Sequence, residues 1–282
     1  MRRRHAVERA LFAWFDAHGR TLDVREAETP WEILVLEVMS QQTQIDRVGP
    51  YWRAFVGRWP TPAALAGAST HDLLGAWAGL GYNRRALALR EAARVIARDH
   101  GGEVPDDPAV LTALPGIGPY TARAVAATAF GRPVAPVDVN VGRVVRRIAG
   151  IDRGRPAIQA AADDLISRDD PRRWVSAVMD LAATICTRRE PRCGDCPVAD
   201  WCASRGTAGD APDATPNSGR FESTNRWLRG RIVARLREAA PGAWVTFRRP
   251  IGPHPADRVA AALVALAGEG FLELDGSRAR IR

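Results

Sequence analysis

The sequence predicts a mainly α-helical protein with a small α/β module at its C-terminus. Apolar residues recur at helical spacing through most of the chain, beginning with Val7, Leu11 and Phe15. A strand pattern near the end, over residues 271–277, enters a tight turn, and residues 278–282 are suited to return as its partner. Helical periodicity therefore predicts the bulk of the fold, and the terminal hairpin predicts the module.

The basic residues of the chain are all arginine: there are 40 of them and no lysine. The formal net charge is +8 and the sequence pI is near 10.4. GC-rich coding explains the choice of arginine but not the surplus of positive charge. Because arginine binds phosphate oxygens in a bidentate manner and stacks on bases, the composition indicates a polyanionic partner. Without lysine, no side-chain amine can form a Schiff base with an opened sugar.

The N-terminus carries no sign of a targeting segment. Met1 to Arg4 lead into a charged helix rather than an apolar signal core, and no apolar run is long enough to span a membrane. At 282 residues, 46% of them hydrophobic, the chain is long enough to bury one large core or two moderate ones. We expect a cytoplasmic protein with no membrane partner.

A helix is predicted over residues 31–39, and it is apolar almost all round, as is typical of a buried helix. Glu37 lies near its C-terminal end among apolar neighbours. Burial disfavours the charged form of a carboxylate, so an unpaired Glu37 has a raised pKa and suits a general acid. A pairing with an arginine, or a position at an exposed edge of the helix, is the structural alternative.

A polar run over residues 40–44 ends this helix and contains Gln41 and Gln42. Amide side chains bond base edges or wedge into a base stack, although they are equally suited to a polar helix end. Further amphipathic helices are expected between residues 46 and 100.

A glycine-rich turn, LPGIGPYT over residues 114–121, lies between two helical patterns. Gly116 and Gly118 leave the backbone uncovered, and Pro119 suits the first position of the second helix, which runs to Phe130. The N–H groups at such a helix end bind anions, so the turn is a candidate phosphate site. An ordinary corner between two helices is the alternative.

Asp138 follows the loop 131–133 and shortly precedes another helical pattern. One interpretation is a carboxylate that caps this helix. The other is a carboxylate that the helix N-terminus keeps ionised and that faces whatever the Gly116–Gly118 turn has bound. Two more helices are expected over about 156–168 and 172–186.

The four cysteines of the chain all lie within 17 residues, with the spacing C-x6-C-x2-C-x5-C. Disulfides are rare in a cytosolic chain, so a compact four-sulfur site is favoured. A zinc site with four thiolates is the alternative, but such sites more usually contain two CxxC pairs. We therefore favour iron and sulfur. The four candidate ligands are Cys186, Cys193, Cys196 and Cys202.

The tail has a different composition. Residues 204–224 are rich in glycine and proline, which predicts a flexible linker. Helical patterns over about 228–236 and 259–266, followed by the hairpin, predict a winged-helix-like module over residues 225–282. The module either binds the polyanionic partner through its arginines or packs against the rest of the chain.

Four motifs together resemble the helix-hairpin-helix (HhH-GPD, endonuclease III-like) DNA glycosylases with a [4Fe-4S] loop. They are LPGIGPYTA, the following PVDVNV, LEVMSQQTQ and the spaced cysteines. The resemblance covers about residues 5–203, and it implies a two-lobed glycosylase domain over residues 1–203 with its cluster loop at 186–202. Within this superfamily, LVLEVMSQQT is similar to the LxxEVMLQQT segment of the adenine glycosylase branch, the MutY family.

The resemblance implies a role for each candidate residue. Glu37 and Asp138 match the catalytic carboxylates, and Tyr120 stands where the endonuclease III branch has its lysine nucleophile. A monofunctional glycosylase without lysine-based lyase activity is therefore implied, and the cysteines would bind a [4Fe-4S] cluster. The residues implied to bind DNA or the flipped base are Arg25, Gln41, Gln42, Gly116, Gly118 and Tyr120.

The implied function is hydrolysis of the N-glycosidic bond of adenine mispaired with 8-oxoguanine or guanine in duplex DNA. We expect a monomer, cytoplasmic and associated with a prokaryotic nucleoid. The chain departs from the family at LDVR (usually LPWR) over residues 22–25, at MDLAA (usually MDLGA) over 179–183, and in the short tail that replaces a Nudix-like domain. A glycosylase for thymine or uracil opposite guanine, and a non-catalytic iron–sulfur DNA-binding protein, are the alternatives.

Overall fold

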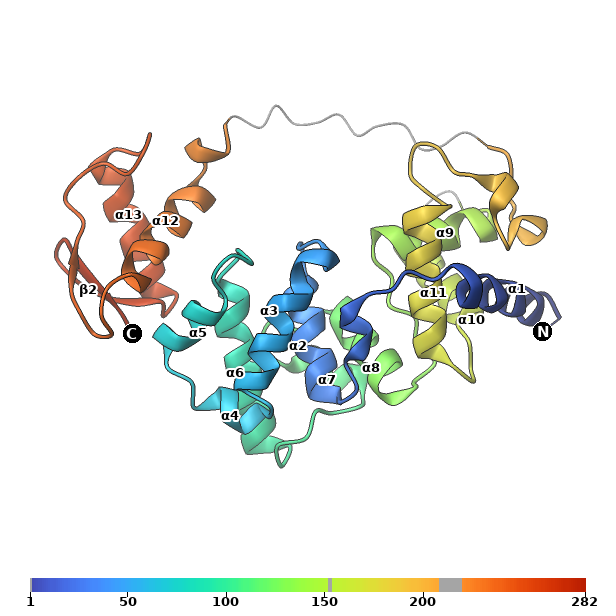
Figure 1. Cartoon of the computed structure of the whole chain (residues 1–282), viewed down its shortest axis with the longest axis horizontal. Helices are drawn as coiled ribbons and strands as arrows, with labels where there is room; N and C mark the ends of the chain where they lie inside the picture. The colour runs from blue at the N-terminus through green and yellow to red at the C-terminus, as the bar shows by residue number, and fades with distance from the viewer. Residues whose placement is uncertain (1, 152–153, 208–219) are drawn as a thin grey trace. The chain divides into compact units, whose positions relative to one another are not determined.

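The computed structural model describes residues 2–151, 154–207 and 220–282, and it divides the chain into two compact units. Unit 1 consists of residues 1–49 and 103–213, and unit 2 of residues 50–102 and 214–282. The described residues are mainly helical, with a small sheet near the C-terminus, as predicted (Figure 1). Residues 208–219 of the predicted linker lie outside the described residues, so the proposed domain division stays a prediction.

Unit 1 contains the predicted buried helix and the glycine-rich hairpin. None of the helices in the described ranges is long and apolar enough to cross a membrane. The α-helices that lie within unit 1 are α1 (Arg2–His18), α2 (Pro30–Ser40), α7 (Pro108–Ala113), α8 (Pro119–Phe130), α9 (Val139–Ala149), α10 (Arg155–Leu165) and α11 (Pro171–Thr184). Its short 3-10 helices are η1 (Asp23–Glu26), η2 (Cys193–Asp195) and η3 (Ala199–Trp201).

Helix α2 packs against α8, and its sequence explains why it begins where it does. Thr29 caps the helix by accepting a hydrogen bond from the Glu32 N–H, and the Glu32 carboxylate accepts one from the Thr29 N–H in return. This reciprocal capping box stabilises the first turn. The predicted burial is confirmed, because Leu34, Val35 and Met39 are fully buried.

The hairpin between α7 and α8 is built as the sequence predicts. Gly116 has a φ of 76°, a left-handed conformation that favours glycine, and Pro119 stands in the first turn of α8. Gly118 is the N-cap of α8, and the backbone there is exposed. The first N–H groups of α8 have no acceptor within the helix itself, which is true of any helix start.

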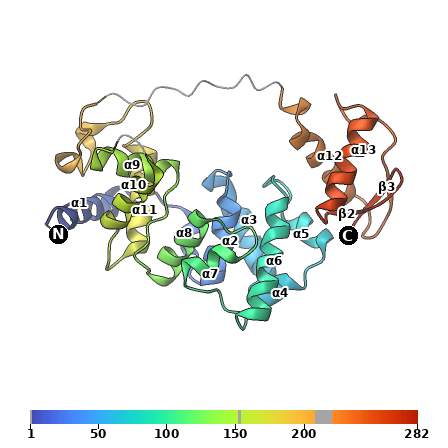
Figure 2. The same cartoon turned by 180° about the vertical axis from the view of Figure 1, so that it is seen from behind.

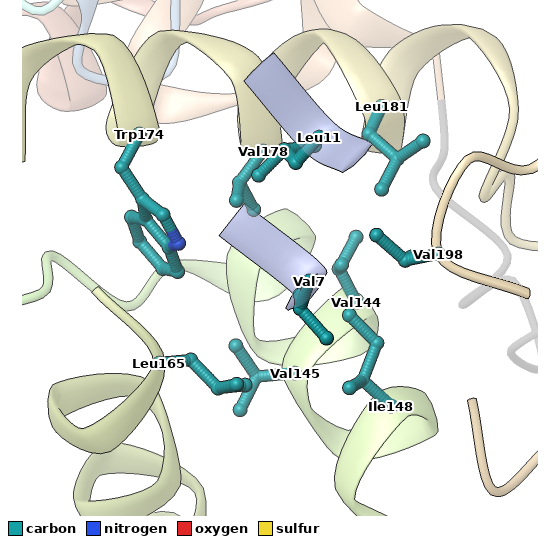
Figure 3. Close-up of a pocket in the computed structure, with 10 residues that line it drawn as sticks. All are labelled: Val7, Leu11, Val144, Val145, Ile148, Leu165, Trp174, Val178, Leu181 and Val198. Atoms are coloured by element: carbon teal, nitrogen blue, oxygen red, sulfur yellow. The ribbon is translucent and has the colours of Figure 1, made fainter. Parts of the chain in front are cut away.

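The core that positions α9 is closely packed. Side chains of α1, α9, α10 and α11 converge with one from the cysteine-rich loop (Figure 3). They leave a void of only about 10 Å³, which is near the lower limit for one water molecule. Because α9 is fixed by this core, its N-terminal residue Asp138 is held in place. The residues around the void are Val7, Leu11, Val144, Val145, Ile148, Leu165, Trp174, Val178, Leu181 and Val198.

Unit 2 combines four helices from the middle of the chain with the C-terminal module. The middle helices are α3 (Ile45–Arg58), which begins in unit 1, α4 (Pro62–Ala66), α5 (Thr70–Ala76) and α6 (Arg84–Asp99). Helix α6 packs against α4 and α5. The module contains η4 (Phe221–Ser223), α12 (Asn225–Arg237), β1 (Val245–Thr246), α13 (Ala256–Gly268), β2 (Leu272–Asp275) and β3 (Arg278–Ile281).

The C-terminal sheet has three antiparallel strands in the order β1-β3-β2. The hairpin of β2 and β3 is confirmed, while β1 lies outside the strands that the sequence predicts. Leu272 pairs with Ile281 and Leu274 with Ala279, so one face of the sheet is apolar. Helices α12 and α13 pack side by side, as Figure 2 shows, and α13 contacts β2. This order of elements is that of a winged-helix-like module.

Candidate active site and iron–sulfur loop

All eight predicted residues other than the cysteines line one cavity of unit 1, with a volume of about 950 Å³. The cavity is bounded by η1, α2, the hairpin turn, α8, the start of α9 and α11. Residues more than 100 positions apart in the sequence therefore share one site. The eight residues are Arg25, Glu37, Gln41, Gln42, Gly116, Gly118, Tyr120 and Asp138.

Glu37 lies on the side of α2 that faces this cavity and is partly buried. Burial raises the pKa of its carboxyl to about 7, and the negative charge of Asp138 contributes to the increase. Glu37 is therefore protonated over much of the range below neutral pH. The expected desolvation of the Glu37 side chain is confirmed. Burial and the Asp138 charge explain the raised pKa without an arginine partner or an exposed helix edge.

Asp138 is the N-cap of α9, and it also faces the cavity. Its Oδ1 accepts hydrogen bonds from the backbone N–H groups of Asn140 (2.9 Å) and Val141 (2.7 Å). Its Oδ2 accepts one from the Asn140 side chain (2.9 Å). These donors hold the carboxylate at the positive end of the helix. The two interpretations of Asp138 are thus compatible in geometry, because the carboxylate that caps α9 also lines the cavity.

Asn140 and Arg143 extend this network away from the cavity. The Asn140 side-chain oxygen accepts a hydrogen bond from Arg143 Nη1 (3.1 Å), and Arg143 Nε donates to the backbone carbonyl of Cys186 (2.9 Å). Arg143 Nη2 also donates to the Ala182 carbonyl (2.9 Å). The site that the sequence predicts does not include Asn140. Its position two residues after a capping Asp is a sequence signal from which its role could be predicted.

Tyr120 and the two glutamines complete the side of the cavity near the hairpin. Burial, with the charges of Glu37 and Asp138, raises the pKa of Tyr120 well above its usual value, so its hydroxyl stays protonated. Gln41 donates to the Thr121 hydroxyl (3.1 Å), which ties the end of α2 to α8. Gln42 has a φ of 55°, an uncommon conformation for a residue other than glycine.

Ser40 and Asp180 are among the polar residues of the cavity that the predicted site lacks. Ser40 Oγ is buried and has no hydrogen-bond partner in the described part of the chain. Asp180, on α11, is completely buried, and its carboxylate accepts hydrogen bonds from Arg20 N, Arg20 Nε and Arg25 Nη2, each at 2.8 Å. An aspartate between apolar residues of a helix requires such partners, and this requirement is the signal that indicates a role for Asp180.

Arg25 therefore has partners inside the protein. Besides the Asp180 ion pair, its Nη1 donates to the Arg20 carbonyl, and its guanidinium lies 4.9 Å from the centre of the Phe15 ring. Arg25 is in the cavity wall, as the resemblance implies, and its binding of DNA or a base stays a prediction.

The cysteine-rich loop follows α11 and surrounds a small cavity of its own. All four cysteines are free thiols and line this cavity, and the other three thiols contribute to the raised pKa of Cys196, mainly an effect of its burial. No three His, Cys, Asp or Glu side chains in the described ranges are grouped to bind a single metal ion. The four-thiol set suits a [4Fe-4S] cluster, which four cysteine thiolates bind.

Arg147 of α9 connects this loop to the core. Its Nη1 lies 3.4 Å from Cys186 Sγ and donates to the Thr187 carbonyl (2.7 Å), while its Nη2 donates to the Arg188 carbonyl (3.0 Å). The side chain is buried, so these bonds fix the start of the loop. A guanidinium beside the thiolates also compensates negative charge on the sulfur ligands.

Comparison with known proteins agrees with this geometry. The HhH-GPD superfamily of base excision DNA repair proteins matches residues 35–167, and the iron–sulfur binding domain of endonuclease III matches residues 186–202. The predicted iron–sulfur cofactor is thereby confirmed in place of zinc. The fold and the cysteine loop together define a DNA glycosylase of this superfamily.

Comparison with individual relatives shows to which branch of the superfamily the chain belongs. The adenine DNA glycosylase of Mycobacterium tuberculosis is 43% identical over 95% of this chain and 96% of its own length. The thymine/uracil-DNA glycosylase of Pyrobaculum aerophilum is 33% identical over 68% of this chain and 87% of its own length. The structure of a thermostable thymine-DNA glycosylase is similar with a TM-score of 0.67, at 27% identity, over 72% of this chain and 97% of that one. The chain belongs to the adenine DNA glycosylase family, the MutY branch of the HhH-GPD superfamily, as the motifs predict.

We expect Asp180→Ala to lower the free energy of unfolding by about 3–5 kcal/mol, because the change leaves two partly buried arginines without their carboxylate. Urea unfolding of the cluster-loaded protein measures this loss. Asp16→Ala is the matched control, since its ion pair with Arg173 is largely exposed and is worth at most about 1 kcal/mol. Equal losses in the two variants would contradict a structural role for the Asp180 network.

The raised pKa of Glu37 predicts a specific dependence of stability on pH. Between its ordinary value of 4.5 and about 7, the folded protein holds a proton that the unfolded chain has lost, so stability falls as pH rises through this window and is level above it. Glu37→Gln removes this loss of stability. Its free energy of unfolding, relative to that of the wild type, should rise by up to about 3 kcal/mol between pH 4.5 and pH 8. Urea unfolding across this range measures the difference.

The control for this prediction is Glu32→Gln on the same helix. Burial raises the pKa of Glu32, but hydrogen bonds from the backbone N–H groups of Thr29 and Glu28 lower it, and the net pKa is below its usual value. The ionised Glu32 carboxylate therefore stabilises the folded protein above pH 4.5, and this stabilisation is lost only in more acidic solution. Glu32→Gln should be less stable than the wild type by the same amount at pH 6 and pH 8. A Glu37→Gln difference that is also constant would show that Glu37 ionises normally.

Proposed function

We propose that this protein is a monofunctional glycosylase that hydrolyses the N-glycosidic bond of adenine mispaired with 8-oxoguanine or guanine in duplex DNA. The observation that carries the proposal is the pair of unlike carboxyls in one cavity: Glu37, whose pKa is about 7, and Asp138, whose charge the start of α9 stabilises. The 43% identity to an adenine DNA glycosylase supports adenine as the base.

Glu37 has the properties that a general acid needs at neutral pH. Departure of a neutral purine requires a proton on the base, because the base would otherwise leave as an anion. A carboxyl with a pKa near the working pH combines a large protonated fraction with a proton that is readily transferred. Glu37 donates this proton to a ring nitrogen of the adenine, and its own carboxylate is then left in the cavity.

Asp138 has the complementary role on the sugar side. As the glycosidic bond breaks, the sugar develops the positive charge of an oxocarbenium ion, as in glycoside hydrolysis. The three hydrogen bonds to Asp138 hold its carboxylate in a fixed orientation in the cavity, where it can face this charge. Asp138 stabilises the cation electrostatically or combines with it until water completes the reaction.

The same cavity accommodates the substrate. A base inside a duplex cannot reach buried groups, so the adenine must first be flipped out of the stack. A volume of about 950 Å³ is ample for a nucleoside, and Gln41 and Gln42 lie at its wall where they can contact base edges. The exposed turn at Gly116 and Gly118, at the start of α8, suits a backbone phosphate.

A lysine-based lyase reaction is not part of the proposal. Such a reaction needs an amine that forms a Schiff base with the opened sugar, and the chain contains no lysine. Tyr120, which stands at the position of the lysine in the endonuclease III branch, is a phenol with a strongly raised pKa and does not supply an amine.

A second candidate is excision of thymine or uracil opposite guanine. It is favoured by the 27% identity and TM-score of 0.67 to a thymine-DNA glycosylase. The segments LDVR and MDLAA, which differ from the adenine family, also contribute Leu22, Arg25, Met179 and Ala183 to the cavity wall.

Base excision by the cluster-loaded protein distinguishes these candidates. Duplexes with A opposite 8-oxoguanine, A opposite G, T opposite G and U opposite G would be treated with alkali after reaction to reveal strand breaks. We expect loss of adenine, with the single-turnover rate lowered about 10²- to 10⁴-fold by Glu37→Gln or Asp138→Asn. Loss of thymine or uracil would support the second candidate, and no excision from any duplex would overturn both.

The general-acid role also predicts the pH profile. Since Glu37 must be protonated to donate, the single-turnover rate should fall about tenfold for each pH unit above about 7. DNA binding by Asp138→Asn, measured over the same range, controls for loss of substrate affinity. A rate that is constant from pH 6 to pH 9 would exclude Glu37 as the proton donor.

A further inference from the structure

Ser40 differs from the family within the segment that contains Glu37. LVLEVMSQQT has serine at the position where the adenine glycosylase segment LxxEVMLQQT has leucine. A hydroxyl therefore replaces an apolar side chain at the last residue of α2, directly after the fully buried Met39. Because burying a hydroxyl without a hydrogen bond costs free energy, a serine at this position requires a partner.

The described ranges of the protein supply no such partner. Ser40 Oγ is buried and forms no hydrogen bond there. A serine in a helix often bonds the carbonyl four residues earlier, here that of Leu36, but this bond is also absent. Among the buried side-chain atoms of the described ranges that have no partner, Ser40 Oγ alone belongs to a residue that lines the catalytic cavity. A molecule that occupies this cavity is therefore the available partner.

Ser40 lies one helical turn after Glu37 on the same face of α2. The cavity wall on this side is formed by residues at the spacing i, i+3, i+4, i+7 and i+8, which is that of one helix face. Side chains at i and i+3 have Cβ atoms about 5–6 Å apart, so they reach neighbouring groups of one bound base. The five wall residues are Ile33, Leu36, Glu37, Ser40 and Gln41.

The group beside the ring nitrogen of a purine is the substituent at C6. In adenine, the N7 acceptor and the 6-amino donor share one edge, and N1 lies on the other side of the same amino group. A serine hydroxyl has one donor and two acceptor lone pairs, so it accepts from an amino group and donates to a carbonyl equally well. Leucine does neither. A 6-oxopurine, which has a carbonyl at C6, therefore also finds a partner at Ser40.

We propose that the Ser40 hydroxyl binds the C6 substituent of the flipped purine, and that this contact extends the substrates from adenine to 6-oxopurines, of which hypoxanthine is the simplest. The inference rests on the proposed function, because it takes Glu37 as the proton donor to a purine. The neighbouring amide of Gln41 already donates to the Thr121 hydroxyl. Ser40 thus determines which purines the cavity accepts.

The test compares three duplexes that contain adenine, hypoxanthine or unsubstituted purine opposite 8-oxoguanine. Single-turnover rates of the cluster-loaded full-length chain, at enzyme concentrations below saturation, report base binding and chemistry together. Dividing each variant's rate by the wild-type rate on the same duplex removes the intrinsic reactivity of the base. We expect the wild type to excise hypoxanthine as well as adenine. Ser40→Ala should lower both rates about tenfold, as loss of one hydrogen bond does, and the rate on purine less than twofold.

Two variants control for effects unrelated to the hydroxyl of the cavity. Ser40→Thr keeps the hydroxyl, so it should keep the wild-type order of the three rates. Ser223→Ala removes an exposed hydroxyl of η4 in unit 2, which donates to the Arg220 carbonyl (2.7 Å), and should change each rate less than twofold. Urea unfolding should show Ser40→Ala to be at least as stable as the wild type, because alanine favours the helix and the lost hydroxyl has no partner.

Binding in a Glu37→Gln background tests the contact without the chemical step. Fluorescence anisotropy gives the affinity for each of the three duplexes. Adding Ser40→Ala should weaken binding of the adenine and hypoxanthine duplexes and leave that of the purine duplex unchanged. This pattern would support the contact even if the enzyme excised none of these bases.

The outcomes separate this inference from the proposed function. Equal slowing by Ser40→Ala on all three duplexes, or no slowing on any, would overturn the contact with the C6 group. A less stable Ser40→Ala would also overturn it, because the hydroxyl would then have a partner within the protein. Excision of adenine but not hypoxanthine by the wild type would overturn the extension to 6-oxopurines. Absence of excision from every duplex would overturn the proposed function, and the binding pattern would then decide on Ser40.

Discussion

Two carboxyl groups share one cavity, and of these two only Asp138 has hydrogen-bond donors among the described residues that compensate a negative charge. Asp138 accepts three hydrogen bonds at the start of α9, whereas desolvation and the Asp138 charge raise the pKa of Glu37 to about 7. The difference between the two groups thus comes from their surroundings and not from their chemistry. It depends on the core of α1, α9, α10 and α11, which fixes the end of α9.

Asp180, which is completely buried, supports another part of the cavity wall. Asp180 accepts hydrogen bonds from Arg20 and Arg25, which lie 160 and 155 residues earlier in the chain. Such a network contributes little net stability relative to an apolar core, but it is sensitive to the loss of any member. It therefore fixes the position of the segment before α2 relative to α11, and with it the shape of the space that a base would occupy.

The sequence predicts local features well and long-range partnerships poorly. The cap at Asp138, the burial around Glu37 and the hairpin at Gly116 follow from neighbouring residues, and the spacing of the cysteines follows from their ligand chemistry. The sequence does not predict strand β1, because two residues are too few to show an alternating pattern and only the pairing with β3 defines the strand. The polar character of Asp180 within an apolar helix is visible locally, but its partners Arg20 and Arg25 lie 160 and 155 residues earlier, so no local pattern identifies them.

The two units are interleaved along the chain, and this order has a consequence for how the protein is made. Helix α5 of unit 2 emerges from the ribosome long before α12, yet Arg237 of α12 donates to the carbonyl of Leu74, 163 residues earlier. Unit 1 has all its described residues by position 207, whereas unit 2 acquires its last helices and its sheet at the end of synthesis. A chain that stops before α12 would complete the catalytic cavity but leave α5 uncovered, which is a surface for chaperones and for aggregation.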